Sequence, residues 1–224
     1  MPSNVLFPID WQNIRHVVLD FGGVLYEIDH NRSTDAFSQL GFPNFGLEHR
    51  HGGQSKLFDQ LERGEVSEQE FLERLKAKCD PGTTMEAVTE AWNALLIGLR
   101  PDALPWVQSL SRHFDLLLLS NTNGIHAAQF EQEILQSKGR MFSDAFRQII
   151  YSHRLGQRKP EVYTYELVAR DYRLDPEMTL LIDDTKENVT GAMAAGWNAV
   201  HLDLSSFSLG QFVRGIGYED FLNR

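Results

Sequence analysis

The chain has 224 residues, of which 42% are hydrophobic, enough to bury a sizeable core as one domain or as one domain with a smaller insertion. Its formal net charge of −10 argues against nucleic acid and anionic membrane surfaces as partners, because both need clustered Lys and Arg side chains. The sequence therefore favours a small-molecule partner.

Three further features bear on where the protein works. The single cysteine, Cys79, cannot form an internal disulfide, and the N-terminus lacks the basic and apolar regions of a secretory signal. No apolar run approaches the roughly 18 residues that a membrane span requires. We therefore expect a cytoplasmic protein without membrane or nucleic-acid contacts, and its oligomeric state stays open.

The first stretch with a clear pattern is the apolar run of residues 16–25. Residues 1–13, interrupted by Pro2 and Pro8, are predicted to be a loosely structured lead-in. The run itself predicts a buried strand that carries Asp20 at its carboxyl end, where ligands bind in an open parallel sheet. Gly22 and Gly23 follow, and they allow a sharp turn or a close approach of the backbone to a ligand.

Residues 33–97 change to helical periodicity. Apolar residues recur in three groups, namely Leu57, Phe58 and Leu61, then Phe71, Leu72 and Leu75, then Val88, Trp92 and Leu95. Ser67 and Thr83 each precede a Glu by three residues, which predicts two capping boxes at helix starts. Glycines at 41, 52, 53, 64 and 82 mark the breaks. This region is predicted to be a helical insertion packed on itself.

From Pro101 onward, strand and helix patterns alternate, which predicts parallel pairing with helices on the sheet faces. The expected strands are 114–119, 146–151, 178–182 and 199–202, and the expected helices are 104–110, 125–135, 161–172 and 187–195. The fold class is therefore α/β, with a doubly wound parallel sheet.

Polar residues follow four of these segments: Asp20, then Ser120 and Asn121, then Lys159, and last Asp183 and Asp184. Such strand ends share one sheet edge, so these groups are expected to converge on one pocket. Two carboxylates can hold Mg²⁺ beside a phosphate, and a Ser hydroxyl, a backbone N–H and a Lys ammonium can hold phosphoryl oxygens. Asp20 would then attack phosphorus as a nucleophile.

Each group also has a simpler interpretation. Asp183 and Asp184 could cap the following helix, and Lys159 could be a solvated lysine before a proline. The Ser120–Asn123 stretch could be a turn with capping residues. The order and spacing of all four groups favour a shared site over these alternatives.

Four ordered motifs resemble those of the haloacid dehalogenase-like (HAD) hydrolases. They are Asp-Phe-Gly-Gly-Val-Leu from Asp20, Leu-Ser-Asn-Thr from Leu119, Leu-Gly-Gln-Arg-Lys-Pro from Leu155, and Leu-Ile-Asp-Asp-Thr-Lys-Glu-Asn from Leu181. Together with Glu-Arg-Gly-Glu-Val-Ser from Glu62, they are similar to bacterial α-D-glucose-1-phosphate phosphatases and the phosphatase domain of soluble epoxide hydrolases. The resemblance implies a Rossmann-like core of residues 1–26 and 101–224, with a helical cap at 27–100.

The resemblance also implies roles for individual residues. Asp20 would be the nucleophile; Asp20, the Gly22 carbonyl and Asp184 would bind Mg²⁺; Ser120, Asn121 and Lys159 would hold the phosphate; Asp183 and Asn188 would lie behind these groups and orient Lys159. Most phosphatases of this superfamily have an Asp acid at the position of Gly22, so the proton donor is missing. Candidate replacements on the following segment are Glu27, Asp29 and His30.

The expected function is a Mg²⁺-dependent phosphomonoester hydrolase that forms an aspartyl-phosphate. Its substrate would be a small phosphorylated metabolite such as a sugar phosphate, with hexose 1-phosphates as candidates because an anomeric oxygen leaves without much help from an acid. Two alternatives stay open. A dehalogenase would also use Asp20 but would need no metal, and a weakly active binding or regulatory protein would turn over no ester.

Overall fold

The centre of the molecule is a parallel sheet of five strands in the order β5-β4-β1-β6-β7. The computed structural model describes residues 9–50, 56–204 and 209–222. The strands are β1 (His16–Leu19), β4 (Asp115–Ser120), β5 (Gln148–Tyr151), β6 (Thr179–Asp183) and β7 (Asn198–His201). The predicted α/β class with a doubly wound parallel sheet is confirmed.

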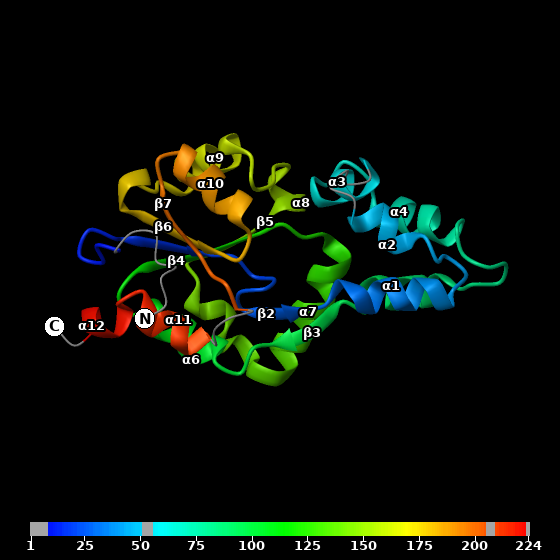
Figure 1. Cartoon of the computed structure of the whole chain (residues 1–224), viewed down its shortest axis with the longest axis horizontal. Helices are drawn as coiled ribbons and strands as arrows, with labels where there is room; N and C mark the ends of the chain where they lie inside the picture. The colour runs from blue at the N-terminus through cyan, green and yellow to red at the C-terminus, as the bar shows by residue number, and fades with distance from the viewer. Residues whose placement is uncertain (1–8, 51–55, 205–208, 223–224) are drawn as a thin grey trace.

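Both faces of this sheet are covered by helices (Figure 1). Val17 and Leu19 of β1 point into one apolar cluster, and Val18 between them points into another. The first face is covered by α6 (Ala103–Leu110), α7 (Gly124–Lys138), α11 (Leu209–Gly215) and α12 (Tyr218–Leu222), and the second by α9 (Val162–Tyr172) and α10 (Lys186–Ala194). This two-sided burial explains why the central strands are almost wholly apolar.

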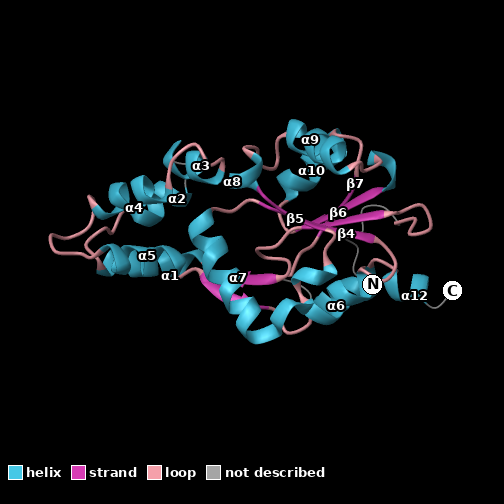
Figure 2. Ribbon diagram, turned by 180° about the vertical axis from the view of Figure 1, so that it is seen from behind, coloured by secondary structure: helices cyan, strands magenta, loops and turns pink. Residues whose placement is uncertain are grey.

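Five helices between β2 and β3 form the helical insertion, residues 30–93, which extends away from the sheet (Figure 2). They are α1 (His30–Gln39), α2 (Phe45–Arg50), α3 (Lys56–Glu62), α4 (Glu68–Lys76) and α5 (Met85–Asn93). They share an apolar cluster, completed by Ile125 of α7, in which Phe58 stacks on Trp92 with 5.5 Å between ring centroids. The exact domain boundaries at residues 26/27 and 100/101 remain a prediction.

A two-stranded antiparallel sheet joins the insertion to the rest of the chain. It pairs β2 (Tyr26–Ile28) with β3 (Leu96–Leu99), and the sequence analysis did not predict it. Strands this short give no periodic signal, and the pairing partner lies at the far end of the insertion.

The start of α5 differs from its prediction. Ser67 caps α4 as predicted and accepts a hydrogen bond from the Glu70 backbone N–H. The cap of α5 is Thr84, which accepts from the Ala87 N–H, and not Thr83, whose hydroxyl donates to the Asp80 carbonyl. The predicted glycine break at residues 52–53 lies outside the described residues.

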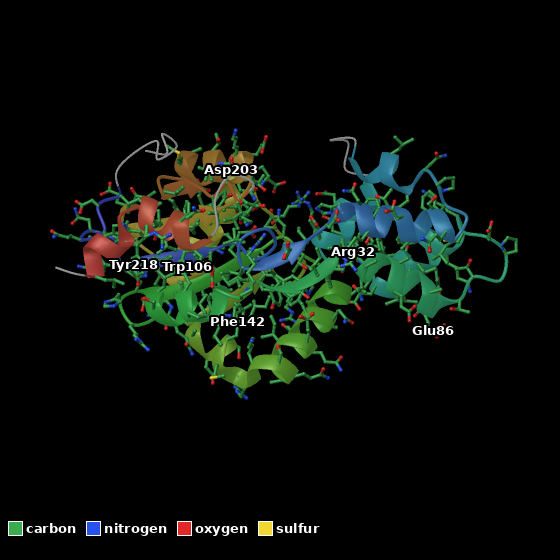
Figure 3. All side chains as sticks on the ribbon, turned by 60° about the horizontal axis from the view of Figure 1, so that its bottom comes forward. Arg32, Glu86, Trp106, Phe142, Asp203 and Tyr218 are labelled. Atoms are coloured by element: carbon green, nitrogen blue, oxygen red, sulfur yellow. The ribbon has the colours of Figure 1, made fainter. Side chains whose placement is uncertain are left out.

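The predicted loose lead-in is wrong for its described part, because Trp11 is buried. Its indole N–H donates to the Ile216 carbonyl at 2.9 Å, and its ring packs on Tyr218. The neighbouring C-terminal helix α12 thus closes one end of the molecule, where Tyr218 and Trp106 lie, while Arg32 and Glu86 lie on the insertion at the other end (Figure 3). Residues 1–8 of the lead-in lie outside the described part of the chain.

Candidate active site

Asp20 is the first residue after the central strand β1. Its backbone N–H donates to the Ile182 carbonyl at 3.0 Å, so the sheet hydrogen bonding continues to the residue itself. The chain then turns, because the Phe21 carbonyl accepts from the N–H groups of both Leu25 and Tyr26. Asp20 is therefore fixed at the carboxyl edge of the sheet, as the sequence predicted.

Lys159 lies directly against Asp20. Its ammonium donates to Asp20 Oδ1 at 2.7 Å and to Asp183 Oδ2 at 2.5 Å, and the residue is only 1% exposed. Burial lowers the pKa of Lys159, but the carboxylates of Asp183 and Asp20 outweigh this effect and hold the pKa above its ordinary value. Lys159 therefore carries a buried positive charge, and its interpretation as a solvated lysine is wrong.

Asp183 connects Lys159 to helix α10. Asn188 donates from its side-chain amide to both carboxylate oxygens of Asp183, at 2.9 and 3.1 Å, and the Thr185 backbone N–H donates to Oδ1 at 2.9 Å. The hydrogen bond from Thr185 is of the kind that the capping interpretation of Asp183 expects. The same carboxylate also binds the Lys159 ammonium, so Asp183 stabilises the turn before α10 and contacts the candidate site as well.

Asp184 completes a group of three carboxylates. One oxygen each from Asp20, Asp183 and Asp184 lies within 4.8 Å of the others. A Cβ atom on Gly23, which has φ +80°, would collide with the Asp184 carboxylate, so the backbone reaches this side chain only because residue 23 is glycine. An all-oxygen donor set with several carboxylates fits Mg²⁺, which prefers such ligands.

The crowding of acids affects Asp20 itself. Burial raises the pKa of Asp20, the charge of Lys159 opposes this effect, and the carboxylates of Asp183 and Asp184 add to it, so that the pKa stands at about 7. Burial, followed by the charge of Asp183, also raises the pKa of Asp184. A divalent cation would offset this repulsion, which is a second reason why the site fits a metal.

Ser120, the last residue of β4, and Asn121, which follows it, lie at the same edge of the sheet. Ser120 is buried at the end of the strand. The side-chain amide of Asn121 donates to the Lys159 carbonyl at 2.8 Å and accepts from the Lys159 N–H at 3.0 Å. Asn123 caps α7, as the turn interpretation expects for part of this stretch.

Ser152, which the sequence analysis did not single out, supports the segment after β4. Its hydroxyl donates to the Thr122 carbonyl and accepts from the Thr122 N–H, both at 2.9 Å. A lone Ser after a short strand gives no sequence signal for this role, which depends on the pairing of β4 with β5.

The candidates to replace the missing acid occupy the β2–α1 segment. Glu27 is exposed on β2, and Asp29 caps α1 by accepting from the Asn31 N–H at 2.9 Å. His30 is the first residue of α1. A side chain at Gly22 would point toward Ile28, whose Cδ1 would lie 3.3 Å from the new Cβ atom.

Known proteins resemble this chain over most of its length. Residues 14–196 match the family model of haloacid dehalogenase-like hydrolases. D-ribitol-5-phosphate phosphatase of Bacteroides thetaiotaomicron is 29% identical over 176 residues, which are 79% of this chain and 85% of the relative.

Solved structures show the same likeness. A predicted HAD-like family hydrolase from Porphyromonas gingivalis superposes with a TM-score of 0.80 at 28% identity, covering 91% of this chain and 98% of the other. A HAD family enzyme from Bacteroides thetaiotaomicron, solved in complex with magnesium and inorganic phosphate, gives a TM-score of 0.75 at 26% identity, with coverage of 86% and 98%. The predictions of a HAD-like phosphatase and of a Mg²⁺ cofactor are borne out by these comparisons. The chain belongs to the haloacid dehalogenase-like hydrolases.

Proposed function

We propose that this protein is a Mg²⁺-dependent phosphatase that hydrolyses small phosphomonoesters through an aspartyl-phosphate on Asp20. The observation that carries the proposal is the convergence of Lys159 with the carboxylates of Asp20, Asp183 and Asp184 at one sheet edge. The relative that acts on D-ribitol 5-phosphate and the similar structure with bound magnesium and phosphate support it.

In this proposal, a carboxylate oxygen of Asp20 forms a bond to phosphorus while the bond from phosphorus to the alcohol oxygen breaks, and the departing oxygen takes a proton from water. A water molecule then attacks the acyl phosphate, which releases inorganic phosphate and regenerates the Asp20 carboxylate. Lys159 and the Ser120 hydroxyl hold phosphoryl oxygens as negative charge redistributes in the transition state. The Asn121 side chain holds the backbone of Lys159, so its contribution to phosphate binding would come from its own N–H.

Asp20, Asp184 and the Gly22 carbonyl would hold Mg²⁺, which supplies charge neutralisation for the phosphoryl group. Asp183 would orient Lys159, since it accepts a hydrogen bond from the ammonium, and Asn188 would orient Asp183 through its own hydrogen bond to that carboxylate. The positions of these residues support the roles that we propose for them.

The substrate is a small phosphorylated metabolite, for which two classes have separate support. The absence of an acid at Gly22 favours esters with good leaving groups, such as hexose 1-phosphates. The relative's activity favours a polyol 5-phosphate, whose alcohol is a poorer leaving group.

Of the described helices, none has the length and apolarity to cross a membrane. We further propose that the protein acts in the cytoplasm on such metabolites.

A dehalogenase is the second candidate, since it would use the same aspartate without a metal. The group of three carboxylates within 4.8 Å of one another disfavours it, because the single positive charge of Lys159 does not balance three acids, whereas an added divalent cation would. A binding protein without turnover is the third candidate.

The deciding experiment is a screen of the purified protein against glucose 1-phosphate, glucose 6-phosphate, D-ribitol 5-phosphate and a 2-haloacid, with Mg²⁺ and with EDTA. We expect phosphate release that depends on Mg²⁺. Halide release in EDTA would establish the dehalogenase instead, and no turnover of any compound would overturn the proposed activity.

A further inference from the structure

Arg158, the residue immediately before Lys159, binds the helical insertion. Its guanidinium donates to Asp59 Oδ1 at 3.0 Å, and its other terminal nitrogen lies 2.8 Å from Glu62 Oε2. Both acids belong to α3, and the Arg158 side chain is largely buried, with 11% exposed. The fixed fork of arginine suits such a pair of carboxylates, which an ammonium could not engage in the same way.

The backbone on either side of this contact is held by the sheet domain, that is, the five-stranded sheet and the helices that cover it. The Arg158 carbonyl accepts from the Thr164 hydroxyl at 2.7 Å, close to the start of α9. The next peptide groups are fixed by Asn121, which binds both the N–H and the carbonyl of Lys159. A short, tightly held segment thus carries Lys159 toward the carboxylates and Arg158 toward α3.

Neighbouring contacts bring the same part of the insertion onto the sheet domain. Arg63 forms a two-pronged ion pair with Glu161, and its Nε donates to Asp59 at 3.0 Å. Gly64, with φ +68°, lies against the His153 carbonyl so closely that a Cβ atom would collide with it. The segment from Asp59 to Gly64 therefore contacts the short helix α8 (Ser152–Leu155) and Glu161, which come before and after Lys159 in the chain.

The charges in this contact are linked to the site. Burial raises the pKa of Glu62, and the charge of Arg158 opposes that effect. The charge of Lys159 also lowers the pKa of Glu62. Without Arg158, the negative charges of Asp59 and Glu62 would lie beside the residues before Lys159 with less positive charge to offset them. Removing the Glu62 charge while α3 stays in place would in turn leave a largely buried arginine with one partner fewer, at a cost in free energy.

We propose that Arg158 is a positioning residue, which couples the placement of the Lys159 ammonium to the seating of α3 on the sheet domain. The proposal rests on the phosphatase function proposed above and adds a residue to it. When Asp59 and Glu62 hold Arg158, the adjacent Lys159 is kept in the geometry that a phosphoryl group requires. Small displacements of such a group are expensive, since about 1 Å can reduce a rate on the order of a hundred-fold.

The test compares Arg158→Gln with Arg74→Gln, a matched control. Arg74 forms an ion pair with Glu70 inside α4, where both side chains are exposed. For each variant we would measure kcat and KM on the best ester from the screen, and the ¹⁵N signal of the buried Lys159 ammonium in protein labelled at lysine. A Lys159→Arg variant assigns that signal.

If the proposal is correct, Arg158→Gln shifts or broadens the Lys159 signal and lowers kcat by roughly ten-fold or more, with a smaller effect on KM. Arg74→Gln changes neither. Glu62→Gln lowers kcat in the same direction, and the double variant Arg158→Gln/Glu62→Gln loses less than the product of the two single effects, because both act through one contact.

An unchanged Lys159 signal in Arg158→Gln, with kcat equal to that of Arg74→Gln, would overturn the proposal, even if the melting temperature falls. Independent effects of Arg158→Gln and Glu62→Gln would overturn the route through α3. If no ester is turned over, the proposed function fails by itself, and the ammonium signal still decides whether Arg158 positions Lys159.

Discussion

The ammonium of Lys159 lies 2.7 Å from Oδ1 of Asp20, although 139 positions separate the two residues in the chain. The contact is buried, and Asp183 holds the same ammonium from the neighbouring strand β6. One cation therefore connects the predicted nucleophile to a second carboxylate.

Replacing Asp20 with Asn should abolish turnover while leaving the fold intact. The amide keeps the size of the side chain but cannot attack phosphorus, so we expect kcat to fall by about a thousand-fold or more. Phosphate release and circular dichroism measure the two effects. Activity close to that of the unaltered protein would show that Asp20 is not the nucleophile.

Replacing Lys159 with Ala should reduce activity more than replacing Ser120 with Ala, because a full charge is lost in place of a hydroxyl. It should also destabilise the metal-free protein by about 3–5 kcal/mol, since Asp20 and Asp183 then face each other without a cation. Denaturant unfolding and kcat/KM test both statements. Lys186→Ala, at an exposed lysine, is the control. A larger loss in Ser120→Ala would contradict the assigned roles.

Gly23→Ala should weaken Mg²⁺ binding without altering any ligand. The new Cβ atom would displace the Asp184 carboxylate, so we expect the affinity to fall by roughly ten-fold, as for Asp184→Asn. Gly82→Ala is the matched control, because Gly82 also has a positive φ but no atom lies within 4 Å of its added Cβ. Calorimetric titration with Mg²⁺ measures the affinities. Equal affinities of the two variants would show that the metal does not bind at Asp184.

Mg²⁺ affinity should rise with pH through the neutral range. Burial raises the pKa of Asp20 to about 7, against the charge of Lys159 and with the help of Asp183 and Asp184. Metal binding requires the carboxylate, so protons compete below that pKa, and affinity at about pH 8 should exceed that at about pH 6 by roughly ten-fold. The Asp20→Asn variant should bind more weakly and lose this dependence. A flat profile in the unaltered protein would show that Asp20 is already ionised.

The glycine at position 22 leads to a prediction about the leaving group. Glucose 1-phosphate should have a higher kcat/KM than glucose 6-phosphate, because its anomeric oxygen needs less protonation. Gly22→Asp should selectively improve the 6-phosphate, since the Cβ atom added there meets only side-chain atoms of Ile28, the nearest of them Cδ1 at 3.3 Å. A wild-type preference for the 6-phosphate would show that another acid, such as Glu27 or Asp29, replaces the missing one.

The sequence by itself determined the α/β class, the helical insertion and the strand ends that carry Asp20, Ser120 and Asp183. These depend on local patterns: apolar runs make buried strands, helical periodicity makes amphipathic helices, and a polar residue after a strand marks its end. Ser67 as a cap follows from the same kind of short-range rule. Such features were predictable because each is encoded within a few neighbouring residues.

Only the tertiary structure decided which groups touch. Trp11 is buried because it meets Ile216 and Tyr218 from the far end of the chain. The β2–β3 pair forms because the insertion brings its two ends together. The contact of Arg158 with Asp59 and Glu62 likewise depends on how α3 is seated, so its role could not be read from the motif that contains it. These contacts depend on packing between segments that are distant in the chain, and local periodicity in the sequence does not predict such packing.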